Sequence, residues 1–177
     1  MDIRDATDLD AEGITVIYND AVEHTTAIWN DQLVDAANRR AWIADRRAAG
    51  FPVLVAVEPD PGNPDAERVL GYATYGPFRP HDGFRRTVEH SVYVRGDQRG
   101  RGLGTDLMAA LLDRARNAGV HVVVAGIDAA NTGSIRLHER LGFTRVGTLR
   151  EVGTKFGSWL DLAFLQLIID DGTPAGR

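Results

Sequence analysis

The chain contains no cysteine among its 177 residues. Disulfide bonds, cysteine nucleophiles and thiolate metal sites are therefore excluded. The N-terminal stretch MDIRDATDLD carries acidic residues where a signal peptide would carry basic and then apolar ones. No apolar run approaches the roughly 18 residues that a membrane-spanning helix needs. We therefore expect a cytoplasmic protein that has no membrane partner.

Lysine is almost as scarce, because Lys155 is the single lysine and arginine supplies the rest of the 20 positively charged side chains. The formal net charge of -5 opposes non-specific binding of nucleic acid, which needs a basic surface. The histidines are scattered and lack the close spacing that metal ligands show. We therefore expect no metal site and no nucleic-acid partner.

The overall composition is that of an ordinary globular protein, with 44% hydrophobic and 25% charged residues. A chain of this length can bury one well-filled core. We expect a single domain over residues 1–170 and a disordered tail over residues 171–177.

Hydrophobic periodicity predicts the element order β-α-α-β-β-β-α-β-α-β-β. Strands are expected around residue 3 and over residues 51–59, 68–78, 86–94, 121–127, 144–153 and 159–169. Helices are expected over residues 7–22, 34–50, 103–119 and 131–142. In the first helix the apolar stripe would consist of Leu9, Gly13, Val16, Ile17 and Ala21. Interleaved strands and helices predict a mixed α/β sheet covered by helices.

An arginine- and glycine-rich turn, QRGRGLG, lies between the strand SVYV and the third predicted helix. Gly100, Gly102 and Gly104 let backbone N–H groups converge on one point, and the helix start adds unsatisfied donors and the positive end of its dipole. The interleaved arginines add fixed positive charge. This arrangement predicts a site for an anion, most naturally a phosphate.

Two common phosphate motifs do not match this turn. A Walker P-loop needs G-x-x-x-x-G-K-[ST], and Lys155 is far from the turn in the sequence. A dinucleotide fingerprint needs G-x-G-x-x-G in the first strand-helix unit. Counted from Gly100, its third glycine falls at Thr105, and the turn follows the fourth strand. Both motifs are therefore poor explanations of the turn.

A third motif, [QR]-x-x-G-x-[GA], is met by Arg99, Gly102 and Gly104. It resembles the acetyl-CoA pyrophosphate loop of the GNAT superfamily of N-acetyltransferases. A more specific resemblance, to the phosphinothricin and methionine sulfoximine N-acetyltransferases within that superfamily, covers nearly the whole chain. Four stretches carry it: IYNDAVEHTTAIWND, YGPFRPHDGFRRTVEHSVYV, HVVVAGIDAANTGSIRLHERLGF and VGTKFGSWLDLAFLQL.

The resemblance implies the GNAT fold, a mixed and mostly antiparallel sheet of about seven strands flanked by about four helices. Two parallel strands, here TVEHSVYV and HVVVAGI, would splay apart and hold acetyl-CoA between them. The family pattern places acetyl-CoA against these residues: Val92, Tyr93, Val94, Arg99, Gly100, Arg101, Gly102, Leu103, Gly104, Thr105, Asn131 and Ser134. Backbone donors near Val94 would also stabilise the oxyanion of the tetrahedral intermediate.

The resemblance also implies a catalytic carboxylate. Glu89 and Ser91 share one face of their strand, and Glu89 would act as general base on the ammonium group of the acceptor. The alternative role for Glu89 is a structural ion pair with Arg85 or Arg86. Many GNAT enzymes carry a tyrosine acid at the position of His138, which leaves His138 or a water molecule to protonate the departing thiolate.

The acceptor site implied by the family pattern consists of these residues: Arg79, Pro80, His81, Phe84, Glu89, His90 and Ser91. The planar guanidinium of Arg79 suits a carboxylate, phosphinate or sulfoximine group. Close relatives usually carry an aromatic residue in place of His81, which points to a different substrate preference. The branch implies N-acetylation of phosphinothricin, methionine sulfoximine or methionine sulfone, a role in detoxification, and a homodimer. In such a dimer Lys155 would border the partner's pocket.

Three alternatives share parts of this pattern. The same fold could acetylate another amine, such as an ordinary amino acid, a polyamine or a protein N-terminus. A non-catalytic acyl-CoA-binding module would tolerate the loss of Glu89. A nucleotide-dependent enzyme would use the glycine-rich turn for ATP or NAD.

Overall fold

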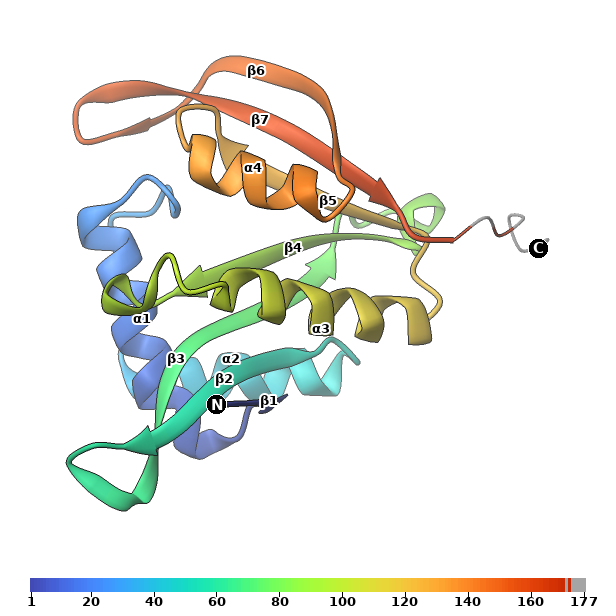
Figure 1. Cartoon of the computed structure of the whole chain (residues 1–177). Coiled ribbons are helices and arrows are strands. Elements are labelled where there is room, and N and C mark those ends of the chain that lie inside the picture. Colours follow the sequence, from blue (N-terminus) through green and yellow to red (C-terminus); the bar gives the residue numbers. More distant parts are fainter. Residues whose placement is uncertain (171, 173–177) are drawn as a thin grey trace.

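The computed structural model describes residues 1–170 and 172, with the backbone alone at residues 64 and 65. This part of the chain contains seven strands and four α-helices in the predicted order (Figure 1). The strands are β1 (Asp2–Asp5), β2 (Val53–Asp60), β3 (Asn63–Pro77), β4 (Thr87–Val94), β5 (Val122–Asp128), β6 (Thr144–Lys155) and β7 (Ser158–Ile168). The helices are α1 (Ala11–His24), α2 (Ala36–Ala48), α3 (Leu103–Asn117) and α4 (Thr132–Arg140). The tail expected over residues 171–177 lies, apart from residue 172, outside the described residues.

The seven strands form one sheet in the order β1-β2-β3-β4-β5-β7-β6. Neighbouring strands are antiparallel except β4 and β5, which run parallel. The pairing of these two strands ends at Glu89 and Val124, although β4 continues to Val94 and β5 continues to Asp128. The two strands therefore diverge in the middle of the sheet, which confirms the predicted splay.

Two helices cover each face of the sheet (Figure 1). Ile14 of α1 and Ile43 of α2 pack on one face, together with Val55 and Tyr72. On the other face, α3 and α4 share a core cluster that includes these residues: Leu54, Val88, Leu107, Met108, Leu111, Val123, Ile135 and Leu165. Successive side chains of a strand point to opposite faces, so β2, β3 and β4 each contribute to both cores. None of the described helices is long and apolar enough to cross a membrane.

The start of α1 differs from the prediction. Residues 8–10 form a 3-10 turn, and α1 begins at Ala11. The carboxylate of Asp10 closes this turn, because it accepts hydrogen bonds from the backbone nitrogen of Thr7 at 2.7 Å and from the Thr7 hydroxyl at 2.9 Å. Leu9, which lies in this turn, is 92% exposed, and Val16 within α1 is 56% exposed, although both were expected on the apolar stripe. The buried residues of α1 are Ala11, Ile14, Ile17, Ala21 and Val22.

The later helix ends follow the sequence more closely. The side-chain oxygen of Asn131 caps α4 by accepting a hydrogen bond from the backbone nitrogen of Ser134 at 3.1 Å. Gly119 and Gly142 follow α3 and α4 with φ of 71° and 92°. This left-handed conformation is the one in which glycine ends helices. Asn131 thus fixes where α4 begins, next to the gap between β4 and β5, and Gly142 fixes where it ends.

Candidate active site

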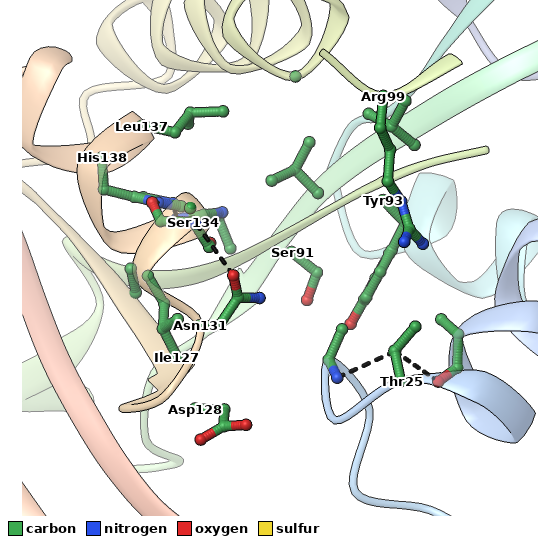
Figure 2. A pocket seen from close by; sticks show the side chains of 18 of the residues that line it. Thr25, Ser91, Tyr93, Arg99, Ile127, Asp128, Asn131, Ser134, Leu137 and His138 are labelled. Carbon is green, nitrogen blue, oxygen red and sulfur yellow. Dashed lines mark hydrogen bonds between the residues drawn. The ribbon is translucent and has the colours of Figure 1, made fainter. Parts of the chain in front are cut away.

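A cavity of about 840 Å³ opens where β4 and β5 diverge. Its volume lies in the range of small-molecule and cofactor sites. The walls come from β4, β5, the turn before α3, the start of α4 and the loop after α1 (Figure 2). Most of the predicted site residues line it: His90, Ser91, Val92, Tyr93, Val94, Arg99, Gly100, Gly102, Leu103, Gly104, Thr105, Asn131, Ser134 and His138.

The glycine-rich turn forms one end of the cavity. Gly100 and Gly102 have φ of 78° and 86°, a conformation that other residues adopt only with strain. A Cβ at either position would project into open space. Gly102 is the cap residue of α3, and the first N–H groups of a helix have no carbonyl partner within it. The turn therefore presents backbone donors and the positive end of a helix dipole to the cavity.

The two arginines of this turn have different positions. Arg99 lines the cavity and lies 3.8 Å from the carboxylate of Asp20. Arg101, which the family pattern also predicts at the cofactor, lies outside the cavity wall and donates to the side-chain oxygen of Gln98. Gln98 is itself buried and lines the cavity. Arg101 therefore supports the turn through Gln98.

A second helix start at the cavity belongs to α4. Asn131 and Ser134 both line the wall, and the side-chain oxygen of Asn131 is used to cap the helix. The NH2 group of the same side chain can then donate to a ligand. The starts of α3 and α4 thus meet on one side of the cavity, the side that these two helices cover. Such a wall suits anionic and carbonyl oxygen atoms.

Glu89 lies on the other face of β4. Tyr93, which shares this face, packs against the core cluster of α1 and α2. The carboxylate lies over Gly126 of β5, where a Cβ would be 3.0 Å from Glu89 Oε1. Gly126 lines the cavity, and Glu89 lies next to that wall without being part of it. Glycine at position 126 therefore makes room for the carboxylate at the edge of the cavity.

The surroundings of Glu89 make it a stronger base than an exposed glutamate. Burial raises its pKa above the ordinary value of 4.5, and the positive charge of Arg79 opposes this shift. The arginines considered as ion-pair partners are engaged elsewhere. Arg86 binds Asp170 at 2.8 Å, and Arg85 donates to a backbone oxygen of its own turn. A carboxylate with a raised pKa is better suited to general-base work near neutral pH.

Two histidines form a hydrogen-bonded pair between β4 and α4. His138 is 1% exposed and His90 is 8% exposed. Nδ1 of His138 lies 2.7 Å from the backbone oxygen of Ser134, and its Nε2 lies 3.0 Å from Nε2 of His90. Because a carbonyl oxygen only accepts, Nδ1 of a neutral His138 carries the proton, and Nε2 of His90 donates to Nε2 of His138. Within the described residues, Nδ1 of His90 is left as a buried acceptor without a partner.

This pair is uncharged at neutral pH. Burial lowers the pKa of both histidines, to about 3 for His90, and repulsion from His138 adds to the shift at His90. The N–H groups of the neutral pair are used between the two rings and on Ser134. His138 can therefore act as an acid only after the pair has taken up a proton.

The β3–β4 loop, which was expected to bind the acceptor, lies outside the cavity wall. Its predicted residues are all exposed: Arg79, Pro80, His81 and Phe84. The guanidinium of Arg79 lies 4.1 Å from the ring centroid of Phe78 and donates to the Phe78 backbone oxygen at 2.7 Å. Its charge acts on Glu89. The fold thus brings Arg79 within electrostatic range of Glu89 but does not bring this loop into the cavity.

Part of the cavity wall was not assigned from the sequence. These residues include Thr25, Thr26, Ala27 and Trp29 from the loop after α1, Ile127 and Asp128 from β5, and Leu162 from β7. In Figure 2, Thr25 lies on the side of Tyr93, across the cavity from Asn131 and His138. The stretches EHTTAIWND and HVVVAGID belong to the family resemblance, but no local pattern marks these positions. Their place in the wall arises from tertiary contacts.

Comparison with known proteins agrees with this geometry. The model of the acetyltransferase (GNAT) family matches residues 14–143. An L-methionine sulfoximine/L-methionine sulfone acetyltransferase of Pseudomonas aeruginosa is 57% identical over 168 residues, which are 95% of this chain and 94% of that protein. The L-amino acid N-acyltransferase MnaT of Escherichia coli is 52% identical over 173 residues, 98% of this chain and 96% of that protein.

Two solved structures share the whole fold. The structure of yncA from Salmonella typhimurium with its cofactor acetyl-CoA has a TM-score of 0.92 and 50% identity, covering 99% of this chain and 98% of that one. A GNAT superfamily phosphinothricin acetyltransferase of Sinorhizobium meliloti, in complex with acetyl-CoA, has a TM-score of 0.89 and 32% identity, covering 99% and 91%. These matches span the elements that build the cavity. The chain belongs to the GNAT family of acetyltransferases.

Proposed function

We propose that this protein transfers the acetyl group of acetyl-CoA to the α-amino group of small amino-acid analogues. L-methionine sulfoximine and L-methionine sulfone are the first candidates, and phosphinothricin is a further one. The observation that carries the proposal is the two-sided cavity between β4 and β5. Helix N-termini face it from the side of α3 and α4, and Glu89 borders it from the side of α1 and α2. A thioester and an amine can therefore meet in the gap.

Acetyl-CoA fits the side of α3 and α4. The turn from Arg99 to Thr105 would hold the pyrophosphate through backbone N–H groups and through the charge of Arg99. The pantetheine arm would lie along Val92 to Val94, beside the amide group of Asn131. Support comes from the glycines with positive φ that face open space and from the two helix starts. These features suit a phosphate-bearing ligand without further change.

Glu89 would act as the general base. An acceptor amine is largely an ammonium at neutral pH and has no lone pair, so it must lose a proton before it can attack. Glu89 takes that proton directly or through a water molecule, and the nitrogen then bonds to the thioester carbon. A backbone N–H near Val94 stabilises the resulting oxyanion, the nitrogen gives its second proton to water, and the C–S bond breaks as the carbonyl re-forms. The raised pKa of Glu89 and its place over Gly126 support this role.

The departing thiolate also needs a proton. His138 lines the cavity and is the side chain considered for this step. Its hydrogen bonds to Ser134 and His90 occupy both of its ring nitrogens. We therefore infer that His138 holds the ring of His90 in place beside the gap between β4 and β5. A water molecule would then give the thiolate its proton.

The acceptor class rests on the named relatives. The Pseudomonas aeruginosa relative carries methionine sulfoximine and methionine sulfone in its name, and the Sinorhizobium meliloti structure is that of a phosphinothricin acetyltransferase. These compounds share an α-amino acid group with a short polar side chain. The Escherichia coli relative is named an L-amino acid N-acyltransferase. An ordinary L-amino acid is therefore the second candidate acceptor.

A homodimer would explain two features of the surface. β6 is an edge strand, and the hairpin of β6 and β7 exposes a set of large apolar side chains: Val146, Leu149, Val152, Phe156 and Trp159. Exposed apolar edges of this kind normally meet another chain. The exposed acceptor residues Arg79, Pro80, His81 and Phe84 could then complete an acceptor site at the dimer interface. We propose a second copy of this chain as the partner.

The proposed reaction also fits a location and a role. Acetyl-CoA is supplied in the cytoplasm. The chain has no cysteine and therefore forms no disulfide, which is compatible with that reducing compartment. Acetylation removes the basic lone pair of an α-amino group and so changes the part of a toxic analogue that resembles an amino acid. We therefore propose a cytoplasmic enzyme that detoxifies such analogues.

Thermal unfolding with acetyl-CoA, ATP or NADH is the first test. Acetyl-CoA should raise the melting temperature, because a ligand that binds only the native state stabilises it. Stabilisation by ATP or NADH but not by acetyl-CoA would overturn the proposed acetyl transfer. Release of CoA on a panel of amines then tests the acceptor class. We expect methionine sulfoximine and methionine sulfone to give the highest kcat/KM.

A further inference from the structure

The single lysine of the chain is buried in its own protomer, contrary to the expectation that it borders a partner's pocket. Lys155 ends β6 and is 4% exposed. Its Nζ donates to the backbone oxygens of Thr25 at 2.7 Å and Ile28 at 2.6 Å, with a longer contact of 3.5 Å to that of Ala21. Ala21 belongs to α1, and the other two residues belong to the α1–α2 loop (residues 25–35). Lys155 therefore points toward the loop that lines the cavity.

These converging carbonyl oxygens explain why a lysine stands here in a chain that otherwise uses arginine. An ammonium offers three donors around one point, whereas a guanidinium is a flat fork that suits paired acceptors. The end of α1 also carries the negative end of the helix dipole. Burial lowers the pKa of Lys155, and a buried cation is costly unless hydrogen bonds hold it. The contact is therefore a specific anchor for the loop.

Two further contacts anchor the same loop to the same half of the sheet. The ring of Trp29 packs on Gly153 of β6, where a Cβ would overlap it. Within the loop, the indole nitrogen of Trp29 donates to the backbone oxygen of Thr26 at 2.9 Å, which links this contact to the next one. The Thr26 hydroxyl donates to the carboxylate of Asp128 at the end of β5. The loop is thus attached to β5 and β6 at three points.

The helices on either side of this loop belong to the other half of the sheet. α1 and α2 pack with β2 and β3, whereas the loop reaches across to β5 and β6. In Figure 1 the blue loop after α1 lies beneath the turn between β6 and β7. The loop therefore bridges the gap between β4 and β5 on the face that carries Glu89 and Tyr93. Acetyl-CoA, in the proposed arrangement, occupies the opposite face.

We propose that Lys155 is a positioning residue for the acceptor amine. It holds the α1–α2 loop against β6, so that Thr25, Thr26 and Trp29 form a fixed wall opposite the gap. This inference rests on the proposed function. Loss of the anchor should let the acceptor bind in several orientations and leave the acetyl-CoA side unchanged. Misplacement of a substrate by about 1 Å is enough to lower a rate by roughly 100-fold.

Three variants test this role. Lys155→Met keeps a long apolar stem without charge or donors, and Lys155→Arg keeps the charge but changes the donor geometry. Arg145→Met is the matched control, because Arg145 is an exposed cation on the same strand that donates to Thr148 at 2.8 Å. Each variant is measured by hydrogen exchange of the loop amides, by the affinity for acetyl-CoA, and by kcat and KM for L-methionine sulfoximine.

We expect both Lys155 variants to lose protection at residues 25–31 and to lower kcat/KM for the acceptor by about 10- to 100-fold. Acetyl-CoA affinity should change less than about twofold, because the turn before α3 is untouched. Arg145→Met should match the unmodified protein in all three measurements. If Lys155→Arg is as impaired as Lys155→Met, a positive charge alone is not sufficient. That result would support the need for an ammonium group that donates to the three carbonyl oxygens.

Contrary outcomes separate this proposal from the proposed function. If the unmodified protein turns over the acceptor and Lys155→Met keeps its kcat/KM, the positioning role is wrong while the enzyme assignment stands. An equal loss of acetyl-CoA affinity would also overturn it. No turnover on any amine by the unmodified protein would overturn the function itself. If Lys155→Met does not fold, Thr26→Val removes another anchor of the α1–α2 loop. Unchanged kcat and KM for the acceptor in that variant would overturn the proposal that the anchored loop positions the acceptor.

Discussion

The two sides of the cavity are built in different ways. On the side of α3 and α4, the polar part of the wall depends on local backbone conformation: glycines with positive φ and two helix starts, one of them capped by Asn131. On the side of α1 and α2, the wall is a loop held by Lys155 and Asp128 from distant strands. The first side depends on local conformation and the second on tertiary contacts. This difference matches a constant donor, acetyl-CoA, and an acceptor that varies between relatives.

Because the two sides of the cavity are built differently, substitutions on each side should change different kinetic quantities. Backbone donors cannot be removed by changing a side chain, so the side proposed for acetyl-CoA should be damaged chiefly by forcing a Cβ into its turn. The side proposed for the acceptor should be damaged by single side-chain changes. Substitutions on the two sides should therefore split cleanly between acetyl-CoA affinity and turnover.

Removal of the carboxylate should give the largest effect. Glu89→Gln keeps the size of the side chain but cannot accept the amine proton, so kcat should fall on the order of 10² or more. Acetyl-CoA affinity, measured by calorimetry, should stay within about twofold. Because the pKa of Glu89 is raised, kcat/KM of the unmodified enzyme should fall on the acid side through a pKa above 4.5. Full activity of Glu89→Gln would exclude this residue as the base.

A substitution in the turn should damage the other side. Gly102→Ala places a Cβ on a residue with φ of 86°, at a cost of roughly 1–2 kcal/mol. The turn should then shift, and the Kd of acetyl-CoA should rise about tenfold. The kcat at saturating acetyl-CoA should change little. Gly147→Ala is the control, because a Cβ there meets open space at an ordinary φ. An unchanged Kd in Gly102→Ala would refute the pyrophosphate role of the turn.

A smaller effect is expected where the two sides meet. In Gly126→Ala the new Cβ would lie 3.0 Å from Glu89 Oε1 and 3.6 Å from Leu162 Cδ1. The carboxylate would have to move by a few tenths of an ångström, and kcat should fall roughly three- to tenfold. Steady-state kinetics at saturating acetyl-CoA would measure this. Unchanged kcat would mean that the carboxylate does not work from its position over Gly126.

The histidine pair should affect stability more than rate. The native pKa of His90 is lowered from 6.5 to about 3, so the unfolded chain takes up a proton first as the pH falls. Stability is then lost as the pH drops below 6.5, by roughly 1 kcal/mol per pH unit for this residue. His90→Gln keeps a donor for His138 but cannot titrate. Urea unfolding at pH 7 and pH 5.5 should give a smaller loss for the variant, and equal losses would contradict the pKa shift.

The features predicted from the sequence are those set by local conformation. The turn at Gly100 and Gly102 and the helix that starts at Asn131 were confirmed, because each depends on a short stretch of chain. The splay of β4 and β5, a contact between distant strands, was expected from the family resemblance and is also confirmed. The stripe of the first helix was wrong at two positions, Leu9 and Val16. A side-chain hydrogen bond in the preceding turn decided where the helix begins, and periodicity does not detect such a bond.

The long-range contacts around the cavity were not predicted for a different reason. Lys155 and Thr25 are separated by 130 positions, and His90 and His138 by 48. The sequence singled out both histidines, but only the fold shows that they bind each other. Likewise, the lone lysine was conspicuous in an arginine-rich chain, yet its partners are backbone oxygens, which have no sequence signature. Contacts of this kind follow only once the sheet has been assembled.

The gap between β4 and β5 has a consequence for the lifetime of the protein. Beyond Glu89 and Val124 the two strands no longer form a ladder with each other, so two strand edges face each other inside the sheet. Free edges attract other peptide groups, and the pantetheine of acetyl-CoA carries amides of this kind. A ligand that completes the sheet would stabilise it by about 2.7 kcal/mol at 100 times its Kd. The resistance of this protein to unfolding and proteolysis should therefore follow the supply of its own donor substrate.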